Sequence, residues 1–155
     1  MTVLDGIVRG RVFADNGLTG GTANDGLQNG GELGIANVIV KLTDCGTTDY
    51  VFAQTDGSGD YQLIVPAVLA TGAVLCVVET NLSGYRNTGG SVGTTGGAYN
   101  LSTDRTQFTY TDGVTLQVLI LLMLHKVLYI PMERNKPNQV LQLRMPINFL
   151  QAQRV

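Results

Sequence analysis

Short stretches in which apolar and polar residues alternate recur along the first two thirds of the chain. In residues 6–13, Val8 falls on one face of such a stretch, while Arg9, Arg11 and Phe13 fall on the other. Alternation with a period of two is typical of a β-strand that buries one face, so the arginines are expected to point to solvent. The same pattern, or a short β-branched apolar run, predicts further strands at residues 37–44, 50–55, 61–65, 74–79 and 105–111.

Clusters of Gly, Asn, Asp, Ser and Pro separate these predicted strands, and no helical pattern precedes residue 116. Short strands joined by turns at close intervals are typical of an all-β sandwich. We therefore expect an all-β, Greek-key β-sandwich of the prealbumin or immunoglobulin type, with about six to seven strands. Residues 81–103 are rich in Gly, Ser, Thr and Asn and show no periodicity, so we interpret them as a long loop.

A long acidic loop lies between the first two predicted strands, and its oxygen-bearing side chains alternate with glycines. Short oxygen ligands on a backbone that turns tightly are typical of Ca²⁺ sites. The same residue types also form ordinary solvated turns that hold no metal, so the sequence leaves both interpretations open. The residues concerned are Asp15, Asn16, Asn24, Asp25, Asn29 and Glu32.

The composition changes abruptly near residue 116. Residues 1–115 contain all 20 glycines, whereas residues 116–155 contain no Gly, Ser, Thr or Asp. Residues 1–115 carry 5 Lys and Arg against 11 Asp and Glu, a net charge of −6, and the remainder carries +4, which together give −2. We therefore expect a β-sandwich module at residues 1–115 and a C-terminal tail of unlike composition at residues 116–155.

Two hypotheses account for this tail. When residues 115–155 are back-translated with permitted codons, a shifted reading frame gives a Gly/Thr-rich string that begins TGVNFADV. A frameshift after Thr115 would then have replaced the closing strand, and the tail would not be a native domain. Alternatively, the tail is a basic amphipathic segment that packs on a partner or on a membrane surface. The apolar run at residues 118–124 is too short to cross a bilayer, so we expect no membrane span.

The two cysteines, Cys45 and Cys76, also allow two interpretations. In an oxidising compartment they can form a disulfide, which would add roughly 3–4 kcal/mol to stability through the entropy of the unfolded chain. Alternatively, Cys76 is a small core residue within the apolar run AVLCVV, and this is the interpretation that we favour.

Four segments resemble the B-type domain of bacterial serine-aspartate repeat adhesins and related prealbumin-like and collagen-adhesin B-type sandwiches. They are IVRGRVFAD, NDGLQNGGELGIANVIVKL, TDGSGDYQLIV and VVETNLSGY, within residues 6–111. The resemblance implies a repeated stalk or spacer module of a secreted or wall-attached bacterial protein, with neighbouring repeats as its partners and calcium stiffening each module. The calcium ligands that the resemblance implies are Asp15, Asn24, Asp25, Asn29, Glu32, Asp56 and Asp60.

Some relatives of that family carry an internal Lys–Asn isopeptide bond whose formation is assisted by a buried acid. Here the first strand has Arg9 and Arg11 and no lysine, and Lys41 is predicted to face outward. Glu79 lies where the acid would be, but its amine partner is missing. We therefore expect no such bond.

Other function classes find little support in the sequence. The one histidine, His125, lies in the tail, so residues 1–115 offer no histidine for a catalytic triad or a zinc site. The acidic balance of these residues argues against nucleic-acid binding. We expect no enzyme, but an extracellular spacer. The alternative is an adhesive module that contacts a host matrix protein or glycan through residues 81–103.

Overall fold

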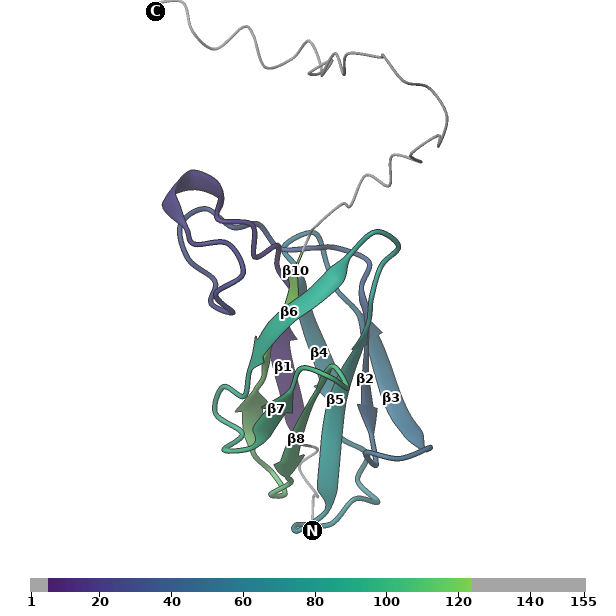
Figure 1. The fold of residues 1–155 in the computed structure, drawn as a ribbon. Coiled ribbons are helices and arrows are strands. Elements are labelled where there is room, and N and C mark those ends of the chain that lie inside the picture. Colours follow the sequence, from purple (N-terminus) through teal and green to yellow (C-terminus); the bar gives the residue numbers. More distant parts are fainter. Residues whose placement is uncertain (1–5, 124–155) are drawn as a thin grey trace, which may run out of the picture.

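The computed structural model describes residues 6–123, and most of the predicted tail lies outside this range. Apart from one short 3-10 helix, every regular element is a strand (Figure 1). No helix within these residues is long and apolar enough to cross a membrane. The elements are β1 (Ile7–Arg11), η1 (Leu18–Gly20), β2 (Ile39–Thr43), β3 (Asp49–Gln54), β4 (Asp60–Ile64), β5 (Val74–Thr80), β6 (Arg86–Ser91), β7 (Ala98–Asn100), β8 (Arg105–Thr109), β9 (Thr115–Gln117) and β10 (Leu119–Met123).

The strands form the two layers of a β-sandwich, which confirms the predicted fold class. One layer is a five-stranded sheet with the order β3-β2-β5-β8-β7. The other contains the three-stranded sheet β4-β1-β9 and the pair β10-β6, with β10 following directly after β9. Ten strands are described instead of six or seven, because residues 86–123 contain β6, β7, β9 and β10 in addition to the predicted strand β8.

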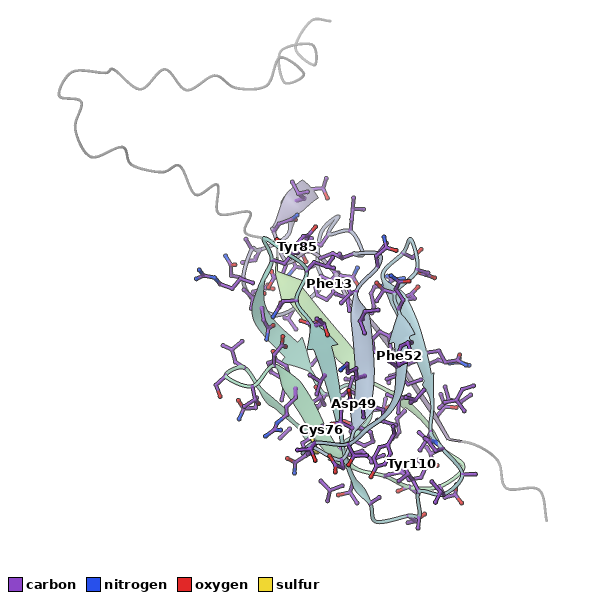
Figure 2. All side chains as sticks on the ribbon, turned by 90° about the vertical axis from the view of Figure 1, so that its right-hand side faces the viewer. Phe13, Asp49, Phe52, Cys76, Tyr85 and Tyr110 are labelled. Carbon is purple, nitrogen blue, oxygen red and sulfur yellow. A yellow bond between two sulfur atoms is a disulfide. The ribbon has the colours of Figure 1, made fainter. Side chains whose placement is uncertain are left out.

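The core follows from the alternation that the sequence predicted. Val8 on β1 lies opposite Leu63 on β4 and Leu116 on β9, and all three are buried. Figure 2 shows Phe13 and Tyr110 towards opposite ends of the sandwich, where both are buried. The expectation that Phe13 shares the outer face with the arginines was wrong. Strand β1 ends at Arg11, and the chain turns Phe13 inward.

Residues 81–103 are not a simple loop, because they contain β6 and β7. Strand β6 pairs with β10, and β7 pairs with β8. The sequence of β6, RNTGGS, has no apolar alternation, so its partners and not its own pattern make it a strand. At Gly90 an added Cβ would overlap the ring of Tyr99, which explains the absence of a side chain there.

The sandwich continues beyond residue 115. Strand β9 pairs with β1, and Leu116 and Val118 are part of the hydrophobic core. Strand β10 extends the described structure to Met123. The origin of the tail, whether a frameshift or a native segment, stays a prediction.

Cys45 and Cys76 form a disulfide, so the interpretation that we favoured was wrong. The register places Cys76 on β5 opposite Thr43 on β2, and the turn after β2 brings Cys45 to a Cα–Cα distance of 4.9 Å. Cys45 has a φ of 65°, and its carbonyl oxygen accepts a hydrogen bond of 2.8 Å from Arg105 Nη1. The two cysteines pair because the sheet places them side by side, and a sequence separation of 31 does not indicate this proximity.

Candidate functional site

The carboxylate of Asp15 anchors the acidic loop. It is fully buried directly after β1, where it accepts hydrogen bonds from the backbone N–H groups of Asn24 at 2.7 Å and Gly26 at 3.0 Å. A longer bond of 3.4 Å comes from Asp25 N. Thr88 Oγ1 on β6 lies 3.2 Å from Asp15 Oδ2, so this one side chain ties the loop both to itself and to the sandwich.

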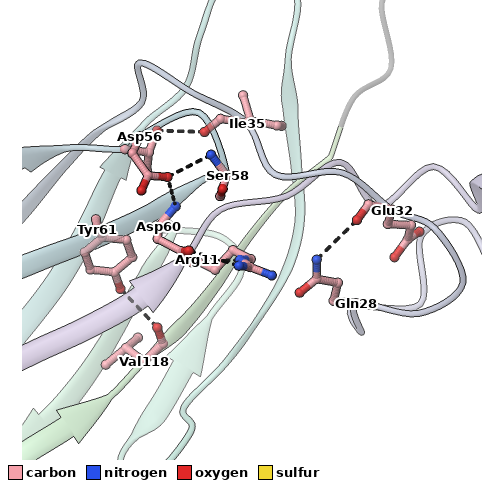
Figure 3. Close-up of polar contacts among 10 residues, drawn as sticks. Arg11, Gln28, Glu32, Ile35, Asp56, Ser58, Asp60, Tyr61 and Val118 are labelled. Atoms are coloured by element: carbon pink, nitrogen blue, oxygen red, sulfur yellow. Dashed lines mark hydrogen bonds and ion pairs between the residues drawn. The ribbon is translucent and has the colours of Figure 1, made fainter.

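Glu32 closes the other side of the loop. Its carboxylate accepts hydrogen bonds from Gly17 N at 2.9 Å and Asn29 N at 3.0 Å. Its carbonyl oxygen accepts one of 3.2 Å from Gln28 Nε2 (Figure 3). The positive φ of Gly17, 67°, lets the backbone turn back towards Glu32. The carboxylates of Asp15 and Glu32 therefore act as internal acceptors for backbone groups that a loop would otherwise leave unpaired.

The remaining loop residues predicted as ligands bond to one another and to the backbone. Asn29 Nδ2 donates to Asp25 Oδ2 at 2.6 Å, and Asn29 Oδ1 accepts from Thr22 N at 2.7 Å. Asn24, which has a φ of 63°, contributes its backbone N–H to Asp15. The structure thus brings these five predicted residues into one loop, where protein donors already engage the oxygens of Asp15, Asp25, Asn29 and Glu32.

Asp56 and Asp60 belong to a second feature, the turn between β3 and β4. Asp56 Oδ1 accepts from the N–H groups of Ser58 at 2.8 Å and Asp60 at 2.9 Å. Asp60 forms a two-pronged ion pair with Arg11 on β1, at 2.7 and 2.9 Å (Figure 3). This hydrogen bonding to Arg11 lowers the pKa of Asp60 and raises the pKa of Arg11. Arg11 was expected to face solvent, and it is half-exposed but paired.

The seven predicted metal ligands therefore lie in two separate hydrogen-bonded features. Within residues 6–123, no group of three or more Asp, Glu, His or Cys side chains is close enough together to hold a metal ion. In this conformation backbone N–H groups occupy the carboxylate oxygens of Asp15 and Glu32, whereas Ca²⁺ takes six to eight oxygen ligands. Calcium would have to displace N–H donors from the carboxylates. Calcium binding stays a prediction.

An open groove of about 870 Å³ borders the Arg11–Asp60 ion pair and was not predicted from the sequence. Side chains with amide or guanidinium groups line much of it. Among the described residues, Arg9 is exposed and forms no ion pair. The polar residues concerned are Arg9, Arg11, Gln28, Gln54, Gln62 and Gln117.

Glu79 is a buried acid without an obvious partner. Only 5% of its surface is exposed, and neither carboxyl oxygen forms a hydrogen bond of ordinary geometry with a described residue. Burial, and secondly the charge of nearby Asp104, raises the pKa of Glu79 to about 10, so that its carboxyl group is neutral at pH 7. Asn87 Nδ2 donates to Asp104 at 2.5 Å and also to the hydroxyl group of Tyr99, which places this polar cluster between β5, β6, β7 and β8.

Among residues 6–123, no lysine lies beside Glu79 in the interior. Lys41 lies opposite Phe52 on the outer face of the five-stranded sheet and forms an ion pair of 2.6 Å with Asp49. Phe52 is 72% exposed and points away from the core (Figure 2). The sequence had marked Glu79 only by the resemblance, because a buried acid within an apolar strand has no distinctive pattern.

No protein family matches the sequence, and no curated protein matches it. Solved structures with a similar fold include a minor pilin and a shaft pilin of bacteria. GBS52, the minor pilin of Streptococcus agalactiae, is 13% identical, with a TM-score of 0.44 over 92% of this chain and 50% of that chain. The shaft pilin SpaA of Lactobacillus rhamnosus GG is 15% identical, with a TM-score of 0.41 over 79% of this chain and 50% of that chain.

A variant of the same shaft pilin gives 16% identity and a TM-score of 0.45, with 52% of that chain covered. This chain therefore spans about half the length of the pilins to which it is similar. The B-type adhesin domain stays a resemblance of the sequence.

Proposed function

We propose that this chain is a structural spacer module of a bacterial surface or secreted protein. The observation that carries the proposal is the direction of its first and last described strands. Strands β1 and β9 are parallel neighbours, and β10 continues in the direction of β9. The described chain therefore enters the sandwich at one end and leaves it at the opposite end (Figure 1).

This arrangement sets the reach of a module. The segment from Thr115 to Met123 runs along the sandwich from the level of Ile7, where β1 begins. At about 3.3 Å per residue, this segment spans roughly 26 Å. Modules connected in this way extend in line, whereas first and last strands that ran antiparallel would bring the chain back to the end from which it started.

Two features stiffen the exit end and the sheet. The acidic loop projects at the end where β10 leaves the sandwich (Figure 1), and Asp15 fastens it to Thr88 on β6. The disulfide joins the turn after β2 to β5. Calcium bound by the acidic loop is a further proposal, in which the ion would replace part of the N–H network around Asp15 and Glu32.

The proposed location is extracellular, with neighbouring modules of the same longer protein as partners. Disulfides persist in oxidising compartments, and the bridge between Cys45 and Cys76 supports this location. The net charge of −2 supports neither nucleic acid nor an anionic membrane surface as a partner.

The spacer proposal is tested by display of the full chain on a cell between a surface anchor and a reporter domain. A spacer makes the reporter more accessible to a large antibody. An unrelated β-sandwich whose ends are equally far apart serves as the control, and it should increase the accessibility of the reporter to the same extent. Immobilised matrix proteins and glycans should not retain the chain. The proposal fails if the reporter does not become more accessible. It also fails if cells bind to an immobilised matrix protein or glycan only when the chain is displayed.

An adhesive module is the second candidate, and the groove beside Arg9 is the observation that favours it. Residues 81–103 are not free to act as one binding loop, since β6 and β7 are parts of sheets. A ligand of the groove should be lost in Arg9→Ala. Equal retention by Arg9→Ala and the native chain would place the contact elsewhere.

A further inference from the structure

Strands β1 and β9, close to the two ends of the described chain, lie side by side and run in the same direction. Ile7, Val8 and Arg9 on β1 pair with residues 115–117 of β9. Backbone hydrogen bonds flank this ladder, from Ile7 N to Val114 O at 3.3 Å and from Val118 N to Arg9 O at 2.7 Å. When the two ends of the chain are drawn apart, β1 and β9 are therefore pulled lengthwise past each other.

The continuation of the last strand is held in the same manner. Strand β10 pairs with β6, from Leu119 opposite Ser91 to Met123 opposite Arg86. Residues 115–123 thus contact β1 along their first part and β6 along their second part, as Figure 1 shows. A pull on the C-terminal side of Met123 acts along both ladders.

Val118 is the point where the two ladders meet. It is fully buried, its N–H donates to Arg9 O, and its carbonyl oxygen accepts a hydrogen bond of 3.1 Å from the hydroxyl group of Tyr61 (Figure 3). The strand passes so close to Gly10 that an added Cβ there would overlap Val118 O. The segment of residues 115–123 is therefore held near its midpoint by hydrogen bonds to both β1 and β4.

We propose that β1 and residues 115–123 form a mechanical clamp that resists tension along the axis of the stalk. A lengthwise pull must break the hydrogen bonds of the ladder together, whereas a pull from one end of a strand breaks them in succession. The purpose of the clamp rests on the proposed spacer function, but its mechanical property belongs to the fold itself.

The disulfide limits how far the chain extends once the clamp has broken. While the disulfide is intact, the chain between Cys45 and Cys76, which are 31 positions apart, cannot be stretched. At about 3.4 Å per residue, reduction should lengthen the unfolding step by roughly 100 Å. This difference identifies unfolding of this module in a single-molecule trace.

The test is force spectroscopy on the full chain held by handles at both ends. A second geometry pulls between an anchor at Ser58, an exposed residue of the β3–β4 turn, and the C-terminal handle. Ser58 lies at the end of the sandwich where β10 leaves it, so this pull peels strands from one end. The end-to-end pull is expected to require the larger force. Equal forces in the two geometries would overturn the proposal.

A matched pair of variants tests which contacts break first. Val8→Ala and Val77→Ala make the same change at fully buried residues, one in the clamp on β1 and one on β5. Contacts already lost in the transition state speed unfolding when they are removed, whereas contacts still intact there do not. Val8→Ala should therefore unfold roughly tenfold faster at a fixed force, and Val77→Ala near the native rate.

Equal acceleration in both variants would contradict the clamp. If Val8→Ala does not fold, Tyr61→Phe provides the same test, because it removes only the hydrogen bond to Val118 O. A negative result here leaves the spacer proposal intact, since the display experiment measures reach and not strength. A failed display experiment likewise leaves the difference between pulling directions unchanged.

Discussion

Replacement of Glu79 by glutamine is expected to remove much of the pH dependence of stability between about pH 5 and pH 8. The carboxyl group of Glu79 has a pKa of about 10 in the folded chain, against 4.5 for an ordinary glutamate. It therefore holds its proton more tightly in the folded state than in the unfolded state. Its contribution to stability is fully present below pH 4.5 and is lost progressively as the pH rises towards 10.

The size of the effect follows from the pKa difference. Each pH unit between the two pKa values costs up to about 1.4 kcal/mol. The free energy of unfolding of the native chain should thus fall by as much as about 4 kcal/mol over three pH units. The raised pKa of Asp104 adds a contribution of the same sign. The lowered pKa values of Asp44 and Asp60 act below this range.

Urea unfolding of both proteins at several pH values measures this directly. The free energy of unfolding of the native chain should fall as the pH rises, whereas that of Glu79→Gln should change much less with pH. The stability of the variant relative to the native chain should therefore increase with pH. Glu32→Gln is a matched control, because Glu32 is equally buried, at 5% exposure, but accepts backbone hydrogen bonds. Glu32→Gln should lower the free energy of unfolding but leave its dependence on pH as steep as in the native chain. A flat profile for the native chain, or an unchanged slope in Glu79→Gln, would refute the reasoning.

Three further predictions concern the loop and the disulfide. Asp15→Asn should lower the free energy of unfolding by about 2 kcal/mol or more in urea titrations, because a buried amide cannot accept all the backbone hydrogen bonds that the Asp15 carboxylate accepts. Asp25→Asn changes an exposed residue of the same loop and should cost less. Equal costs would show that Asp15 does not anchor the loop. If the loop binds calcium, millimolar Ca²⁺ should raise the melting temperature by several degrees over EDTA, whereas an unchanged melt, or a rise retained in Asp25→Ala, would place no ion there. Joint replacement of Cys45 and Cys76 by alanine should cost roughly 3–4 kcal/mol, and unchanged stability in urea would show that the bridge adds nothing.

The strands that bury one regular face were predictable from the sequence. Strands β2, β4, β5 and β8 lie within one or two residues of their predicted ranges, because β-branched and aromatic residues alternate there. Strand β6 and the disulfide were not predictable. Both depend on which strands become neighbours, and the register between Thr43 and Cys76 is a property of the folded sheet.

The candidate site shows the same division. The sequence indicated correctly that residues 15–32 form one oxygen-rich loop, but it could not indicate what those oxygens bind. A metal ion and a ring of backbone N–H groups both select Asp, Asn and Gly, since both need short acceptors on a tightly turning chain. Thr88, which donates to Asp15, lies on a strand far away in the sequence.

The pairing of Ile7 with Thr115 also determines when the module can fold during synthesis. Strand β1 acquires β4 as a neighbour early, but its other edge stays open until residues 115–118 have been made. Contacts between residues so distant in sequence form slowly. If the chain is exported unfolded through a narrow channel, the sandwich of this module cannot be completed until residues 115–118 have emerged.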